Sequence, residues 1–402
     1  MTERFDTDMG DTGGYTAEQL LKALEAVRFI SAENLKTGDT VKDYCQKRGI
    51  PMEILKELGF GSIPSPKILT EKMKAMGADS GCLQVLGLLN GSRTSVLTNR
   101  LTIPIMDRTG RVVAFSGRAL KDDVKPKYLN TSTSPVFEKR KILYGLDRCI
   151  KTAKDNDLIL VEGFMDVVGA RMVGVQNCAA TMGTSLTEEQ TALIRDLGCT
   201  VTMVYDNDDA GRLGMCRAVR LLTKQGVPVS VISLSDLDRQ FVKDETLAHK
   251  DLMDYARLGV KAGDLAKIRE PGLTFLFRES YFRTAVQDSR QFCSILQAAR
   301  EDLRLSGSRA AFLDVAVRNS PFTQDQILRL CRNETLDLSG KTEKAANHKK
   351  DLVLKEQDIV RWYMQQAVEK GPETCRKILG QLEQTLSQER SHTWDRDMDH
   401  DH

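Results

Sequence analysis

The sequence has 402 residues, of which 41% are hydrophobic, and this is enough apolar material for the cores of two to three domains. Its 58 basic and 56 acidic residues give a formal net charge of +2, so the total charge favours neither nucleic-acid nor membrane binding and any basic site must be local. The nine cysteines form no C-x-x-C or C-x-x-x-x-C pair, which excludes a legible zinc ribbon or disulfide framework. The polar, acidic N-terminus and the absence of an apolar run of roughly eighteen residues predict a cytoplasmic protein without membrane contact.

The first part of the chain is predicted to combine helices with a small sheet. From about Thr16 to Leu58 the apolar residues recur at helical spacing, and glycines and prolines between Gly59 and Pro66 then interrupt the pattern. From Arg100 onward, two β-branched runs flank the segment "DRTG", a pattern typical of a β-hairpin. We therefore expect a helical entry segment followed by antiparallel strands.

Residues 157–234 alternate short apolar runs with helical patterns. The predicted strands are "DLILVEG", "VQNCAAT", "TVTMVYD" and "VPVSVISL", and helices are expected near 164–173, 187–197 and 209–225. The segment "TEEQ", which begins at Thr187, matches a capping box at the start of the second helix. Strand–helix–strand alternation of this length predicts a parallel sheet with both faces covered.

The chain is predicted to be helical from about Ala262 to about residue 335, and the fold class is α/β, or α+β overall. The expected organisation is a disordered N-terminus (1–15), a basic α+β subdomain (16–156), a parallel-sheet subdomain (157–261), a helical subdomain (262–335), a charged linker (336–351) and a short helical segment with a polar tail (352–402).

Carboxylates follow two of the predicted strands. Glu162 ends the run "LILVEG", and Asp206 and Asp208 end the run "VTMVYDND". Ligands of parallel α/β sheets bind beyond the carboxyl ends of the strands, where clustered carboxylates repel one another unless a cation lies between them. A lone Glu-Gly is typical of a turn and a lone Asp-x-Asp of a solvated loop, but their placement on successive units of one sheet predicts a site for Mg²⁺ or Mn²⁺. Asp166 lies one turn into the following helix, either near this site or as a helix cap.

A locally basic segment precedes these carboxylates. From Arg118 to Lys154 there are ten Lys and Arg residues but only four Asp and Glu residues, with Tyr128, Phe137 and Tyr144 between them. Such a run alone is typical of a solvated face. Beside a metal site, whose remaining partners are usually phosphates, it becomes a candidate clamp for a nucleic-acid backbone or a triphosphate.

These motifs together resemble a known family. The segments "VEGFMDVV", "TMGTSLTEEQ" and "YDNDDAGR" are similar to a Toprim domain, whose sheet is Rossmann-like. The preceding "NRLTIPIMDRTGRVVAFSGRAL" and "KPKYLNTSTSPVFEKRKILYGL" resemble the basic subdomain that comes before Toprim in bacterial DnaG-type primases, and "YCQKRGIPMEILKELGFGSIP" fits the same family. The resemblance runs from about residue 40 to about residue 330. It implies an RNA polymerase core that makes short RNA primers on single-stranded DNA from ribonucleoside triphosphates.

The resemblance also implies roles for individual residues. Glu162, Asp206 and Asp208 would hold the catalytic Mg²⁺ or Mn²⁺ ions, with Asp166 and Asp209 close by. The residues implied to face template, primer or nucleotide are Arg100, Arg118, Lys127, Asn130, Lys139 and Lys141. A replicative helicase or a separate template-recognition protein is a further implied partner.

The sequence departs from the family pattern at two places. The cysteine spacing and the length before residue 40 do not fit the family's N-terminal zinc-binding domain, so we expect no structural zinc. The third acidic element of the family has its best match in "VKDETL", which makes Asp244 the expected additional metal ligand. Two alternatives stay open: a Toprim-type nuclease, and a non-catalytic primase-like protein that binds single-stranded DNA.

Overall fold

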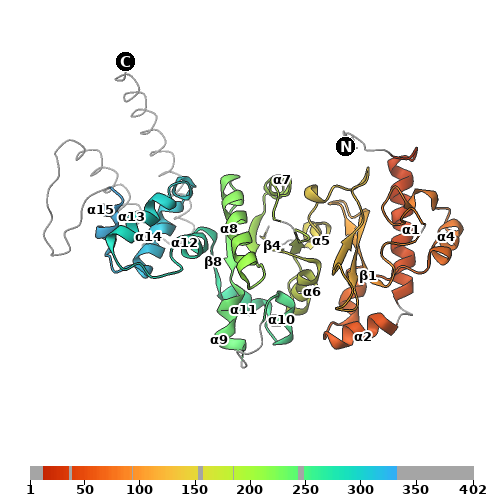
Figure 1. Ribbon diagram of the computed structural model, residues 1–402, viewed down its shortest axis with the longest axis horizontal. Helices are drawn as coiled ribbons and strands as arrows, with labels where there is room; N and C mark the ends of the chain where they lie inside the picture. Colours follow the sequence, from red (N-terminus) through yellow and green to blue (C-terminus); the bar gives the residue numbers. More distant parts are fainter. Residues whose placement is uncertain are drawn as a thin grey trace, which may run out of the picture. The chain divides into compact units, whose positions relative to one another are not determined.

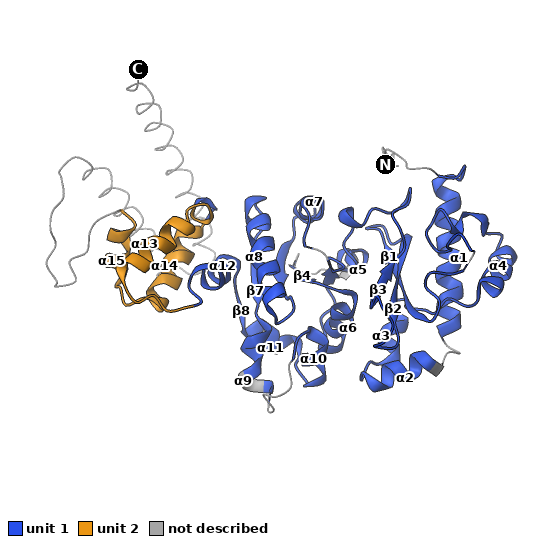
Figure 2. Cartoon of the chain, viewed as in Figure 1, with its two compact units in different colours: residues 1–283, 304–306 blue, residues 284–303, 307–402 orange. Residues whose placement is uncertain are grey.

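The computed structural model describes residues 12–35, 39–92, 94–152, 157–183, 185–242 and 249–332. The chain divides into two compact units, residues 1–283 with 304–306 and residues 284–303 with those from 307 onward (Figure 2). The linker and short helical segment that the sequence predicts within 336–402 lie outside the described residues.

The first unit begins with a helical layer against a small sheet. Helix α1 buries Leu20, Leu24, Val27 and Ile30, whose spacing places them on one face of the helix, against α4 and β2. The helical elements of this layer are α1 (Ala17–Leu35), α2 (Asp39–Lys47), α3 (Met52–Glu57), α4 (Pro66–Ala75) and η1 (Gly81–Leu83).

The hairpin predicted around "DRTG" is present. Strands β1 (Arg100–Met106) and β2 (Val112–Ala119) pair in antiparallel fashion, and β3 (Tyr128–Asn130) extends the sheet from β2. The turn is held by Asp107, whose Oδ1 accepts hydrogen bonds from the backbone N–H groups of Thr109 (2.9 Å) and Arg111 (3.0 Å). Every residue of β1 and β2 is buried, because the sheet lies between two apolar cores.

The same unit contains a second sheet, of five strands (Figure 1). The strand order is β5-β4-β6-β7-β8, and the first four are parallel. The strands are β4 (Asp157–Val161), β5 (Cys178–Ala180), β6 (Thr200–Met203), β7 (Val229–Ile232) and β8 (Arg269–Pro271). The parallel sheet predicted from the sequence is thus confirmed for β4 to β7.

Helices connect the strands and cover the sheet on both faces. On one face, α6 and α10 contribute to one of the two apolar cores that lie against the β1–β3 sheet. On the other face, α7, α8 and α12 surround Leu158, Leu160 and Val201. The capping box expected at α7 is present, because Thr187 Oγ1 accepts from the N–H of Gln190 and Gln190 Oε1 accepts from the N–H of Thr187, each at 3.1 Å. The helical elements are η2 (Lys139–Lys141), α5 (Leu146–Thr152), α6 (Phe164–Val173), α7 (Glu188–Asp196), α8 (Asp209–Lys224), η3 (Leu234–Leu237), α9 (Asp238–Phe241), α10 (Leu252–Arg257), α11 (Ala262–Lys267) and α12 (Gly272–Tyr281).

The expectation that the chain is helical from about Ala262 to about residue 335 is wrong at one point. Strand β8 interrupts the helices and pairs antiparallel with β7, so the sheet is mixed rather than purely parallel. An ion pair of 2.9 Å between Arg269 Nη1 and Asp157 Oδ2 joins β8 to β4. Since β8 has only three residues, its sequence is too short to show the alternation by which a strand is recognised.

The second unit is helical in its described part. It contains α13 (Ser289–Ala298), α14 (Ser308–Asn319) and α15 (Gln324–Leu330), and η4 (Asp302–Arg304) lies at its border with the first unit. Phe292 packs against Phe312 and Phe322, with ring centroids 6.2 and 5.7 Å apart. None of the helices described in either unit is long and apolar enough to cross a membrane.

Helices α6 and α10 pack so closely that the replacement Gly169→Ala should destabilise the protein. A Cβ atom at Gly169 would lie 2.7 Å from the backbone nitrogen of Met253, which cannot move without shifting α10. We expect a loss of about 1–3 kcal/mol in the free energy of unfolding, measured by urea denaturation. Gly263→Ala on α11 is the matched control: nothing lies within 4 Å of its added Cβ, so the variant should gain up to about 1 kcal/mol from helix propensity. Equal effects of the two substitutions would contradict the close packing.

Candidate functional site

Parallel pairing of β4 and β6 brings two carboxylate-bearing segments to one edge of the sheet. Glu162 follows β4 directly, and Asp206 lies three residues beyond the end of β6. The side chain of Glu162 accepts a hydrogen bond from the backbone N–H of Asp206, with a distance of 3.1 Å between Oε1 and N. Burial and the neighbouring carboxylate of Asp206 raise the pKa of Glu162. The predicted meeting of these strand ends is therefore seen in the structure.

Asp208 lies at the start of α8 and is held there by the helix. It is the N-cap residue, and its Oδ1 accepts from the backbone N–H of Gly211 at 2.8 Å. Hydrogen bonds from Lys250 and from that N–H lower the pKa of Asp208. The next residue, Asp209, is exposed and forms an ion pair with Arg212 on α8. Asp208 and Asp209 thus have different partners although they are adjacent in sequence.

The carboxylates of Asp206 and Asp208 converge on one cation, the ammonium group of Lys250. Lys250 Nζ lies 3.2 Å from Asp206 Oδ2 and 2.7 Å from Asp208 Oδ2, and this pairing raises the pKa of Lys250. Carboxylate oxygens are also the ligands that divalent ions such as Mg²⁺ prefer in proteins. Among the described residues, however, no three His, Cys, Asp or Glu side chains are already placed as a complete set of metal ligands.

Two more aspartates stand beside this pair. Asp166, in the first turn of α6, is 9% exposed and accepts from the N–H of Gly163 at 2.9 Å. Burial raises its pKa well above the ordinary value, and the charges of Asp251 and Asp206 raise it further. Asp251 caps α10, where its Oδ1 accepts from the N–H of Asp254 at 2.9 Å, and burial raises its pKa too.

Asp251 is a residue that the sequence analysis missed. The third acidic element was assigned to "VKDETL", but Asp244 lies outside the described residues, so its role stays a prediction. In the structure, Asp251 instead lies close enough to Asp166 and Asp206 for its charge to raise the pKa of both. The capping pattern of Asp251 and Asp254 marks the start of a helix in the sequence, but only the packing of that helix against α6 brings Asp251 to the other carboxylates.

The two arginines expected to face phosphates, Arg100 and Arg118, are buried. The guanidinium of Arg118 lies between the rings of Tyr44 and Tyr128, 5.6 and 5.1 Å from their centroids, and it also donates to the hydroxyl of Tyr128. Arg100 Nη1 donates to the carbonyl oxygens of Gly117 (3.2 Å) and Pro126 (2.8 Å). Both side chains therefore support the β1–β3 sheet and are fixed by protein groups.

The other predicted contact residues differ in their surroundings. Asn130 is half-buried in β3, opposite Ser116 of β2. Lys127 is exposed as a whole, but protein atoms around its amine remove part of its hydration. This partial desolvation and the charges of Arg118 and Arg48 lower the pKa of Lys127, while Asp251 raises it. Burial also lowers the pKa of Lys139.

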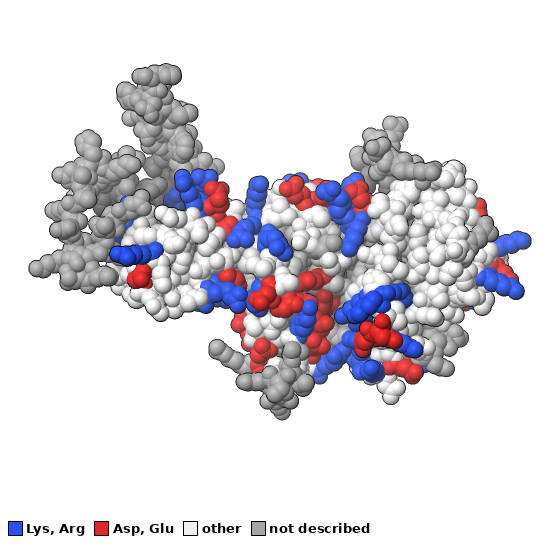
Figure 3. Space-filling model, in the orientation of Figure 1, with Lys and Arg blue, Asp and Glu red and all other residues white. Residues whose placement is uncertain are grey.

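Acidic and basic side chains gather next to each other on one face of the first unit. Lys141, in η2, is half-exposed, and its Nζ lies 2.6 Å from Glu138 Oε2. Figure 3 shows Asp and Glu side chains collected over the region of α6 and α10, with Lys and Arg side chains beside them over α2 and the β1–β3 sheet. A ligand with phosphates and bound cations could contact both groups at once.

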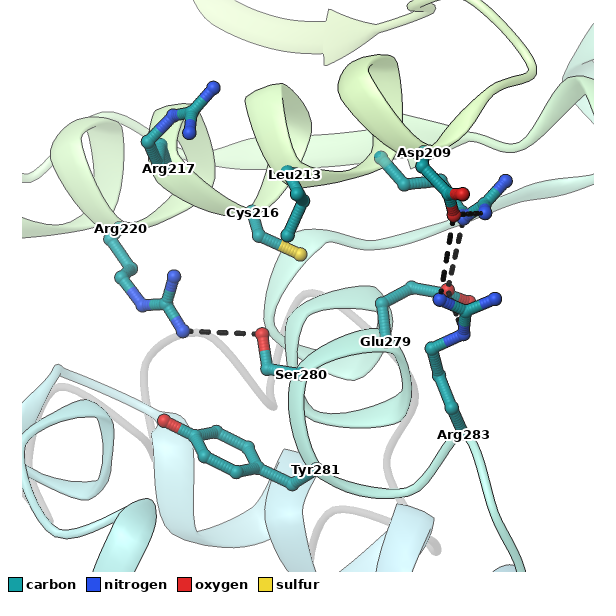
Figure 4. Close-up of a pocket in the computed structure, with 10 residues that line it drawn as sticks. Asp209, Leu213, Cys216, Arg217, Arg220, Glu279, Ser280, Tyr281 and Arg283 are labelled. Carbon is teal, nitrogen blue, oxygen red and sulfur yellow. Dashed lines mark hydrogen bonds and ion pairs between the residues drawn. The ribbon is translucent and has the colours of Figure 1, made fainter.

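A cavity of about 620 Å³ lies elsewhere in this unit, between α8 and the end of α12 (Figure 4). Its charged groups largely pair with one another: Glu279 Oε2 lies 3.9 Å from Nε of both Arg212 and Arg283, and Arg220 donates to Ser280 Oγ at 3.2 Å. The lining contains neither Glu162, Asp206 nor Asp208. These three carboxylates are therefore outside the cavity, although Asp209 at the start of α8 is one of its lining residues.

The buried carboxyl of Asp166 should make stability depend on pH. Its pKa is raised in the folded state, so the native protein binds more protons than the unfolded chain above about pH 4, and stability falls as the pH rises. In chelator, Asp166→Asn should therefore gain stability relative to the wild type between pH 5 and pH 8, with the gain increasing with pH. Urea denaturation of both proteins at several pH values measures this. A difference that does not change with pH would contradict it.

Comparison with known proteins places these features in a family. Residues 29–150 match the family described as DNA primase catalytic core, N-terminal domain, and residues 159–241 match the family described as Toprim-like. A DNA primase of Staphylococcus aureus (strain COL) is 36% identical over 204 residues, which are 49% of this chain and 34% of that protein. A DNA primase of Halalkalibacterium halodurans is 38% identical over 230 residues, 54% of this chain and 38% of that protein. The matched region thus spans little more than a third of these relatives.

Solved structures agree with these matches. The Aquifex aeolicus primase, with its zinc-binding and RNA polymerase domains, aligns with a TM-score of 0.57 at 26% identity and covers 79% of this chain and 77% of that one. A DnaG catalytic core aligns with a TM-score of 0.61 at 23% identity over 78% of this chain and 99% of that one, which shows a common fold. The chain therefore carries the catalytic core of a DnaG-type DNA primase, with a primase N-terminal domain followed by a Toprim-like domain.

Proposed function

We propose that this chain synthesises short RNA primers on single-stranded DNA by nucleotidyl transfer that depends on Mg²⁺ or Mn²⁺. The observation that carries the proposal is the convergence of Asp206 Oδ2 and Asp208 Oδ2 on one cation, next to Glu162, at the carboxyl edge of the Toprim-like sheet. The adjoining match to a primase N-terminal domain favours primer synthesis over strand cleavage. A solved neighbour described as the DnaG primase catalytic domain bound to ssDNA supports single-stranded DNA as the template.

The acidic residues are proposed to hold the metal ions. Asp206 and Asp208 would contribute the oxygens that now share the ammonium of Lys250, and Glu162 would add a third carboxylate from the neighbouring strand. Asp251 is a further candidate, since it is half-buried and electrostatically coupled to Asp206. Bound divalent ions supply charge neutralisation at the phosphates and activate the primer 3′-hydroxyl for in-line attack on the α-phosphate.

The basic residues are proposed to contact phosphates from the side of the N-terminal domain. Lys127 is exposed and close to the acidic cluster, and Lys139 and Lys141 stand on η2. Arg118 and Arg100 are proposed to act indirectly, because their guanidinium groups already bind protein groups and stabilise the sheet whose strand β3 begins directly after Lys127. Ribonucleoside triphosphates, the RNA primer and a helicase or template-recognition protein remain part of the proposal.

Removal of either converging carboxylate should abolish synthesis. Asp206→Asn and Asp208→Asn keep the size of the side chain but remove the charge, so we expect primer synthesis to fall by roughly two orders of magnitude or more, because bound metal supplies several kcal/mol of transition-state stabilisation. The assay uses a single-stranded template, labelled ribonucleotides and Mg²⁺ or Mn²⁺. Asp209→Asn is the matched control, since Asp209 is exposed and paired with Arg212, and it should stay within a few-fold of the wild type. Full activity of both Asp206→Asn and Asp208→Asn would refute the site, and DNA binding without synthesis by the wild type would favour a non-catalytic protein.

Neutralising Lys127 should weaken binding to single-stranded DNA and reduce its dependence on salt. Each phosphate contact contributes about 0.7 to the slope of log affinity against log salt for single strands, so Lys127→Gln should lower the slope by roughly that amount. Fluorescence anisotropy with a labelled oligonucleotide at several salt concentrations measures it. Lys72→Gln on α4 has the same change in net charge and should leave the slope unchanged. An unaltered slope in Lys127→Gln would assign this lysine to a solvated surface.

A further inference from the structure

The ammonium group of Lys250 contacts carboxylates that lie more than forty residues earlier in the sequence. Its ammonium nitrogen lies within ion-pair distance of two carboxylates at once, 3.2 Å from Asp206 Oδ2 and 2.7 Å from Asp208 Oδ2. The side chain is 55% exposed, so it reaches the pair from the solvent side. Burial of the Lys250 side chain is therefore not what fixes the contact.

Backbone hydrogen bonds hold Lys250 against the segment that carries the two aspartates. The backbone N–H of Asn207, which lies between Asp206 and Asp208, donates to the carbonyl oxygen of Lys250 at 2.7 Å. The backbone N–H of Lys250 in turn donates to Asp254 Oδ2 at 3.0 Å. The main chain at Lys250 is thus attached both to the loop after β6 and to α10. These two attachments position the ammonium group of Lys250.

The carboxylates around the Lys250 ammonium group are stabilised by a cation at this position. Glu162 stands next to this pair, because its Oε1 accepts a hydrogen bond from the backbone N–H of Asp206 at 3.1 Å. One ammonium group therefore faces three neighbouring carboxylates. Since like-charged carboxylates repel, their close approach in a protein without bound metal depends on a positive group between them.

We propose that Lys250 is an internal competitor of the divalent ion: its ammonium joins Asp206 and Asp208 in the metal-free protein, and it must leave both carboxylates before a metal ion can bind to them. This inference rests on the proposed metal-binding role of the two aspartates. It makes Lys250 a positioning residue that keeps the carboxylates together while no metal is bound. It also makes metal binding weaker than the carboxylates alone would allow.

The test is the binding of Mn²⁺ alone, without nucleotide or DNA, measured by isothermal titration calorimetry on the full chain. Lys250→Met should bind Mn²⁺ about three- to thirty-fold more tightly than the wild type, the factor expected from two partly exposed ion pairs that no longer have to be broken. Lys250→Arg keeps a cation at the site and should stay close to the wild type. Lys261→Met has the same change in net charge away from the carboxylates, and it should leave the affinity unchanged.

A second variant guards against a folding defect. Lys250→Gln keeps a polar side chain of similar length and should also bind Mn²⁺ more tightly, while far-ultraviolet circular dichroism reports the fold. In both neutral variants the rise in melting temperature on addition of saturating Mn²⁺ should exceed that of the wild type, because the metal-free state has lost its counter-ion. Unchanged or weaker Mn²⁺ binding in the folded neutral variants would overturn the competition.

Asp206→Asn separates the two proposals. If it abolishes Mn²⁺ binding while Lys250→Met fails to strengthen it, the metal site stands and the role of Lys250 is overturned. If Asp206→Asn leaves Mn²⁺ binding intact, the proposed metal site is wrong, and the inference about Lys250 fails with it.

Discussion

The register between β4 and β6 is the constraint on which the site depends. Leu160 pairs with Met203 in the parallel ladder, and the N–H of Val204 continues it by donating to the carbonyl oxygen of Leu160 at 2.9 Å. Because both strands run in the same direction, the residues that follow them emerge together, and Glu162 reaches the N–H of Asp206. A slip of one residue would send each side chain of β4 to the opposite apolar core, where its packing partners differ, so the packing that stabilises the sheet also fixes the position of the carboxylates.

Two glycines allow helices to pack closely against the backbone segments that form the site. Gly211 lies in the first turn of α8, where a Cβ atom would overlap the carbonyl oxygen of Asp206, so the helix that begins at Asp208 can approach the loop this closely only with glycine there. Gly169 of α6 does the same for α10, whose first turn follows Lys250 and Asp251. The acidic segments and the lysine that joins them are thus positioned by backbone contacts, which are stiffer than contacts between long side chains.

The sequence revealed those features that depend on local patterns. The turn at Asp107, the capping box at Thr187 and the apolar runs that end in Glu162 and Asp206 are each encoded within a few neighbouring residues. The position of Asp251 was missed because it depends on the packing of α10 against α6, a contact between segments far apart in the chain. The short strand β8 was missed for a related reason, since its three residues become a strand only by pairing with β7.

The basic segment is a second example of a feature that the sequence alone does not predict. In the sequence Arg118 looks like one cation in a run of many, but its guanidinium lies between Tyr128 and Tyr44, and Tyr44 is contributed by α2. Charge alone therefore does not distinguish an arginine that supports a sheet from a lysine that faces a ligand.

The central claim is that Asp206 and Asp208 form one cation site, shared in turn by Lys250 and a divalent ion. A crystal structure of the protein soaked in Mn²⁺, with anomalous scattering recorded to locate the metal, tests this claim most directly. The account predicts an anomalous peak between Asp206 Oδ2 and Asp208 Oδ2, beside Glu162, with the Lys250 side chain turned away from both. A Mn²⁺ peak at another place, with Lys250 still joining the two aspartates, would contradict it.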